Sequence, residues 1–245
     1  MVFVWPLSTW ALVRNLDKPR YKILKPLTTR KSWLHSGYVA EVRQYQPYIV
    51  AQVDIEGATM DTALSEGFRQ VANFIFGNNT KDGAVEKVAM TAPVGLETAR
   101  SEKVAMTAPV GADVLQGTVS TCPHNISIPP PHTDGSHYRV WFMMPFKYTS
   151  IDQLPRPNND RVTLRQVPAQ TLAAITFSGP GPREDTMAAK QNELLALLKE
   201  AGVEAVPGVA PKLWQYHPPF APPWQRRNEV LVDVQGVVEG AAQPS

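Results

Sequence analysis

Two strand-like segments followed by one helix-like segment occur twice along this 245-residue chain. In the first half, residues 38–45 and 48–55 alternate as strands do, and residues 60–76 place apolar side chains at helical spacing. In the second half, residues 162–178 read as a hairpin and residues 184–201 as a helix. Each helix has to bury one apolar stripe against a sheet, which restricts the chain to two similar sheet-and-helix layers that pack as one unit.

Further strands are expected over residues 138–144 and 231–234. With about eight strands in total, closing the sheet on itself removes the exposed edges. The sequence therefore predicts an α+β fold, a distorted antiparallel β-barrel with two flanking helices. The barrel is expected to consist of two pseudo-symmetric βαββ-like halves, at about residues 36–145 and 160–235.

Charge and cysteine content disfavour several classes of protein. Lys and Arg number 24 against 22 Asp and Glu, and a net charge of +2 is unlike the strongly basic surface of a nucleic-acid binder. Cys122 is the only cysteine, so an internal disulfide and a Cys-based zinc site are both excluded. The five histidines lack the HExxH spacing of a helical zinc site.

Catalytic motifs are also missing from the sequence. It contains no GxSxG and no close Cys–His pair, and we expect no enzymatic activity. Glu41 and Glu229 stand on the first and last strands and could meet in the barrel, where we expect them to serve packing and hydrogen bonding.

Residues 1–20 are expected to form an apolar and basic arm, and residues 236–245 a C-terminal tail. The apolar part of the arm is shorter than the roughly 20 residues of a membrane span and lacks the features of a secretory signal. It suits a packing arm or a weak peripheral membrane contact. Because basic residues outnumber the single Asp17 between residues 14 and 31, the chloroplast is the alternative to an expected cytoplasmic location.

An exact internal repeat follows the first helix. Residues 86–95, with the sequence EKVAMTAPVG, recur as residues 102–111. Apolar side chains alternate in each copy, which suits a strand that Pro93 or Pro109 would end. The simplest interpretation is a local duplication without a role of its own.

Several of these segments resemble the SOUL haem-binding protein family. The resemblance covers about residues 21–234, and we assign residues 21–235 to a SOUL-like domain. It is carried by the EVRQY segment at residues 41–45, Gly67-Phe68, the FIFGNN segment at residues 74–79, the two MTAPV copies, and the RRNEV segment at residues 226–230.

The resemblance implies that the chain binds haem or another porphyrin without a covalent bond, as a monomeric carrier, buffer or sensor. The expected site is an open apolar groove between the first helix and the loop before the last strand, here residues 60–76 and 216–224. The cofactor contacts it implies are Leu64, Phe68, Arg69, Val71, Tyr216, His217, Phe220 and Trp224.

The residues expected to bind the porphyrin propionates depart from the family pattern. Family members place basic residues where this chain has Ser65, Asn73 and Ala221. Arg69, Arg226 or Arg227 would then supply the positive charge.

The expected iron ligand departs as well. A histidine proposed as an iron ligand in some members is Gln44 here, which leaves His217 as the candidate metal ligand. These departures leave one alternative open, a protein-interaction or scaffold module that keeps the fold without ligating haem.

Overall fold

The computed structural model describes residues 16–29, 39–56, 59–98, 137–181, 183–217 and 221–235. Two α-helices lie within these ranges, α2 (Met60–Ile75) and α3 (Glu184–Glu200), together with two short 3-10 helices, η1 (Ile151–Gln153) and η2 (Pro223–Gln225). The strands are β1 (Tyr21–Thr29), β2 (Val39–Tyr45), β3 (Tyr48–Glu56), β4 (Asn79–Thr80), β5 (Val94–Thr98), β6 (His137–Met143), β7 (Arg156–Pro157), β8 (Thr163–Val167), β9 (Gln170–Phe177), β10 (Glu204–Ala205), β11 (Lys212–Gln215) and β12 (Asn228–Gln235).

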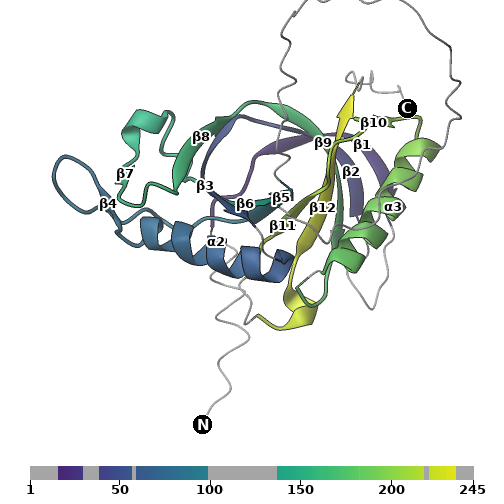
Figure 1. Ribbon diagram of the computed structural model, residues 1–245. Coiled ribbons are helices and arrows are strands. Elements are labelled where there is room, and N and C mark those ends of the chain that lie inside the picture. The colour runs from purple at the N-terminus through teal and green to yellow at the C-terminus, as the bar shows by residue number, and fades with distance from the viewer. Residues whose placement is uncertain are drawn as a thin grey trace, which may run out of the picture.

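One antiparallel sheet contains most of these strands, in the order β1-β2-β9-β12-β11-β5-β6-β3-β8. From β2 to β8 this order is pseudo-symmetric. Strands β2, β3, β5 and β6 of the first half hold the positions that β8, β9, β11 and β12 hold when the order is read from the other end. The sheet curls into an incomplete barrel, and both helices lie on its outer side (Figure 1). The predicted α+β barrel of two pseudo-symmetric halves with two flanking helices is confirmed.

The two faces of the sheet are packed differently. On the outer face, α2 packs against β3 and β6, and α3 packs against β9 and β12. The inner face is filled by aromatic side chains from four strands. Trp141 and Trp214 meet edge to face with ring centroids 5.4 Å apart. The rings of Tyr45 and Tyr48 also contact the Trp214 ring, with centroids 5.1 and 6.5 Å away. The inside of the barrel is therefore an aromatic core.

Two glycines allow close approach where larger residues would not fit. A Cβ atom on Gly67 of α2 would lie 2.5 Å from the Cβ of Val140 on β6. A Cβ atom on Gly95 of β5 would lie 2.0 Å from the indole ring of Trp141. Gly67 thus sets how closely α2 approaches the sheet, and Gly95 makes room for the largest side chain of the inner face.

The structure corrects three expectations drawn from the sequence. No strand was expected over β1, in a stretch noted only for its excess of basic residues, or over β11, between the second helix and the loop before the last strand. In the first repeat copy the strand begins after Pro93, not before it. The amide groups of Val88 and Ala92 donate instead to the carbonyls of Ile75 and Asp17, so this part of the copy bonds outside the sheet ladder.

Neither α2 nor α3 combines the length and apolar character that a membrane-spanning helix needs.

The close contact at Gly67 gives a prediction about stability. Gly67→Ala should lower the free energy of unfolding by about 1–3 kcal/mol, because the overlap with Val140 outweighs the roughly 1 kcal/mol that alanine adds to helix propensity. Ser65→Ala, on the exposed side of the same helix, is the matched control and should leave stability unchanged or slightly higher. Urea unfolding measures both, and equal stability of the two variants would contradict the packing argument.

Candidate functional site

Two of the segments behind the family resemblance, EVRQY and RRNEV, meet inside the barrel around Glu229. The Glu229 carboxylate, on β12, is fully buried, and the Arg43 guanidinium, on β2, is 1% exposed. They form an ion pair of 2.9 Å, although 186 residues separate them in the chain. Strand β9 lies between β2 and β12 and brings the two motif segments within reach of each other.

Four side chains donate hydrogen bonds to Glu229. They are Arg43, Arg227 at 2.6 Å, Tyr216 at 2.7 Å and Thr176 at 2.9 Å. Burial alone would raise the pKa of Glu229, but the charges of Arg43 and Arg227 and the hydrogen bonds hold it below its ordinary value. The carboxylate is therefore ionised and fully paired at neutral pH.

Arg43 ties the remaining motif residues into the same network. Its Nε donates to Glu41 at 2.8 Å, and one terminal nitrogen donates to the Tyr45 hydroxyl at 3.1 Å. The expected meeting of Glu41 and Glu229 in the barrel is confirmed, with Arg43 between them. The EVRQY segment of β2 and the RRNEV segment at the start of β12 thus fix β2, β9 and β12 relative to one another, which is a structural role.

The first wall of the expected porphyrin groove lies on α2. Leu64 and Phe68 are half-buried and pack on the core, where the Phe68 ring lies 5.2 Å from that of Phe142. Arg69 is exposed, whereas Val71 is completely buried beneath the helix. Leu64 and Phe68 thus present partial apolar surface beside an exposed cation, and Val71 belongs to the core.

The second wall lies in the loop between β11 and β12. Tyr216 is buried, with its hydroxyl committed to Glu229, while Trp224 in η2 is 74% exposed. Phe220 lies outside the described residues. Among the described residues of this loop, Trp224 is the large aromatic side chain that is exposed to solvent. The assignment of these residues as porphyrin contacts stays a prediction.

The strand that packs against the first wall and the strand that leads into the second are neighbours in the sheet. Val94 of β5 packs in the same core cluster as Leu64 and Phe68, and its partner across the sheet is Gln215, the residue before Tyr216. The loop that carries Trp224 therefore leaves the sheet one strand away from the cluster beneath α2, at the lower edge of the barrel in Figure 1.

His217, the candidate iron ligand, is half-buried in this loop. Its Nδ1 accepts a hydrogen bond of 3.1 Å from the backbone N–H of Arg227. A neutral imidazole that accepts at Nδ1 carries its proton on Nε2, so iron ligation through Nε2 requires this hydrogen bond to break. Gln44, where some relatives have histidine, is exposed on β2 and points away from the face that carries Arg43 and Tyr45.

Positive charge gathers around His217. Burial and the nearby cations Lys18, Arg227 and Arg226 all lower the pKa of the imidazole. Lys18 was not recognised from the sequence as part of this region, because it precedes the loop by about 200 residues in the chain. Cations beside an exposed Trp224 suit an aromatic ligand that carries carboxylates.

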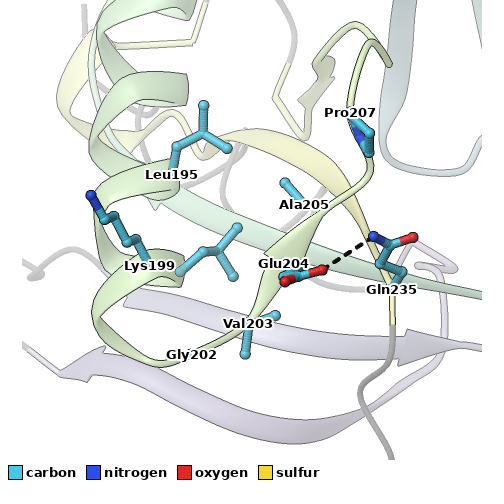
Figure 2. Close-up of a pocket in the computed structure, with 9 residues that line it drawn as sticks. Leu195, Lys199, Gly202, Val203, Glu204, Ala205, Pro207 and Gln235 are labelled. Atoms are coloured by element: carbon cyan, nitrogen blue, oxygen red, sulfur yellow. Dashed lines mark hydrogen bonds between the residues drawn. The ribbon is translucent and has the colours of Figure 1, made fainter.

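The described residues also form hollows elsewhere. One, of about 530 Å³, lies between the C-terminal end of α3 and β10, with Leu195, Val203 and Ala205 on its walls (Figure 2). A hydrogen bond of 3.4 Å from Gln235 to Glu204 closes one side of it. Another, of about 300 Å³, separates the N-termini of α2 and α3. Within the described ranges, no group of three or more potential metal ligands comes together.

The Glu229 network predicts a large effect from a small change. Glu229→Gln should lower the free energy of unfolding by about 3 kcal/mol, because it leaves the Arg43 and Arg227 charges without their shared carboxylate. Asp54→Asn is the matched control: its bidentate pair with Arg139 is of similar length, 2.8 Å, but 47% of the Asp54 side chain is exposed. That variant should lose about 1 kcal/mol or less. Comparable losses in urea unfolding would show that burial of the network is not what matters.

The lowered pKa of His217 predicts a pH dependence of stability. An unfolded histidine titrates near pH 6.5, so as the pH falls below about 6.5 the unfolded state takes up a proton before the folded state does. Stability therefore decreases on acidification through this range. His217→Asn keeps an acceptor for the Arg227 N–H but does not titrate, and its stability should fall less steeply between about pH 6.5 and 5. Parallel stability curves for the variant and the wild type would refute this reading of His217.

Comparison with known proteins places the chain in a family. The sequence profile of the SOUL heme-binding protein family matches residues 16–233. No curated protein matches the sequence.

Solved structures share the fold at low sequence identity. The EcmrR C-terminal domain superposes with a TM-score of 0.50 at 10% identity, over 81% of this chain and 98% of that domain. In the EcmrR–DNA complex the same TM-score and identity apply to 80% of this chain but only 57% of the other, so this chain spans a little over half of that protein. A hydrolase from Listeria innocua gives a TM-score of 0.47 at 12% identity, over 80% of this chain and 91% of that one. The EcmrR likenesses concern the fold alone.

The family match covers most of the chain and includes every described residue of the Glu229 network. The chain belongs to the SOUL heme-binding protein family.

Proposed function

We propose that the protein binds haem or another porphyrin reversibly on its surface, without a covalent bond and without catalysing a reaction on it. It would act as a carrier, buffer or sensor of the tetrapyrrole. The observation that carries the proposal is the membership in a heme-binding family over residues 16–233. The protein's expected location in the cytoplasm, or alternatively in the chloroplast, and its expected monomeric state remain predictions.

The packing of the barrel supports a porphyrin site on its outer surface. The inside of the barrel is filled by Trp141, Trp214 and their neighbours, so a flat ring has to bind outside it. Leu64 and Phe68 of α2 and Trp224 of the loop between β11 and β12 supply partly exposed apolar surface outside the barrel. In this proposal the ring contacts these three side chains.

The charges beside Trp224 suit the two propionates of the ligand. Arg226 follows Trp224 closely in the chain, and Arg226 and Lys18 both lie close enough to His217 to lower its pKa, whereas the Arg227 charge is paired with Glu229. Haem would supply an iron centre that a nearby side chain could ligate. The hydrogen bond that His217 accepts from Arg227 disfavours an iron bond there, so ring contacts and propionate pairing provide most of the affinity in this proposal.

Trp224 offers a direct test, because its exposure allows replacement without disturbing the core. Purified protein should shift and intensify the hemin Soret band with saturation near one equivalent, and Trp224→Ala should weaken binding about tenfold. Phe76→Ala is the matched control, since Phe76 is 59% exposed but lies at the far, C-terminal end of α2. Its affinity should equal that of the wild type.

Iron-free protoporphyrin separates ring contact from ligation. Its affinity should lie within about threefold of that for hemin if the ring and propionates dominate. His217→Asn should likewise leave the hemin spectrum unchanged. Absence of saturable binding of both ligands would refute the proposed function, and a much weaker protoporphyrin complex would refute only the minor role given to iron.

A further inference from the structure

The exact repeat at residues 86–95 and 102–111 has a consequence for folding. The first copy occupies a definite place: it leads from the end of α2 into β5. Its fixed contacts are formed either by backbone atoms or by side chains that both copies possess. The second copy lies outside the described residues.

The contacts of the first copy begin at Glu86. Its backbone exchanges two hydrogen bonds with the Asn79 side chain, of 2.8 and 3.0 Å, and its carboxylate accepts from the Tyr148 hydroxyl at 2.7 Å. Val88 follows, buried, with its amide bonded to the Ile75 carbonyl. Glu102 and Val104 carry the same groups at the same spacing.

The contacts continue to the start of β5. The Thr91 hydroxyl donates to the Met143 carbonyl, and the Ala92 amide donates to the Asp17 carbonyl at 3.0 Å. Gly95 then lies against the Trp141 ring, where no other residue fits. In the second copy, Thr107 corresponds to Thr91, Ala108 to Ala92 and Gly111 to Gly95.

We propose that residues 102–111 can take the place of residues 86–95, so that the chain has two registers for this part of the sheet. In the second register the connection from β4 would run through residues 81–101, and the connection to β6 would shorten from residues 99–136 to residues 115–136. Because the entropy of closing a loop changes slowly with its length, lengthening one connection and shortening the other gives only a small net cost.

The residues after each copy decide between the two registers. Leu96 is 2% exposed in the core, and Glu97 accepts a hydrogen bond of 3.2 Å from the Trp141 indole. The second copy continues with Ala112 and Asp113, which are smaller and shorter. The first register is therefore the major one, and the second is a minor state of the same fold whose population these flanking residues set.

A double-mutant cycle at the two glycines tests the proposal in the full-length chain. Gly95→Val blocks the first copy against Trp141, and Gly111→Val blocks the second. Gly111→Val alone should be neutral, and Gly95→Val should lose only part of its stability because the second copy replaces the first. In urea unfolding the double variant should lose much more stability than the sum of the two single losses. A Gly95→Val protein as unstable as the double variant would overturn the proposal, as would a stable double variant.

Hydrogen exchange gives an independent test without damaging the first copy. Ala112→Leu combined with Asp113→Glu gives the second copy the flanking residues of the first. Exchange protection should then decrease over residues 86–95 and increase over residues 102–111. The matched control carries Gly111→Val in addition, which blocks the second register and should restore wild-type protection over residues 86–95. Unchanged protection in the variant without the block would overturn the proposal.

Discussion

The buried ion pair between Arg43 and Glu229 is the interaction on which the arrangement of this barrel depends. A carboxylate taken entirely out of water is costly unless each of its lone pairs is matched, and here four donors from β2, β9 and the loop between β11 and β12 converge on it. A shift of any contributing strand along its neighbour would leave a charge unpaired in an aromatic interior. The network therefore fixes the relative positions of β2, β9 and β12 more strictly than apolar contacts alone would.

The same network separates the structural part of the family signature from the part that concerns a ligand. Glu41, Arg43, Arg227 and Glu229 are conspicuous in the sequence, yet their charges are spent on one another inside the barrel. Leu64, Phe68 and Trp224 lie outside this network and keep partly exposed apolar surface near the expected site. The EVRQY and RRNEV segments thus identify the scaffold, and the proposed ligand surface lies on residues that these two segments do not contain.

The sequence was sufficient for the elements with strong periodicity. The stripe of α2 and the alternation of β2 and β3 predicted their type and their place in the fold, because half-buried elements leave a regular pattern. Strands β1 and β11 were missed. Their residues include Pro26, which disfavours a strand, and Lys25 and Lys212, whose ammonium groups find partners only in the folded chain, as Lys212 does with Asp233 at 2.7 Å. The cluster of Lys18 with His217 could not be foreseen for the same reason, since only the fold brings residues from the two ends of the chain together.

The order of strands in the sheet also bears on how the molecule unfolds. Although the chain consists of two similar halves, β2 of the first pairs with β9 of the second, and β3 of the first pairs with β8 of the second. Neither half can close its hydrogen bonds without the other, so cutting the chain between them would not yield two small domains. Such interlaced pairing over long sequence separations makes for slow folding and for a single cooperative transition.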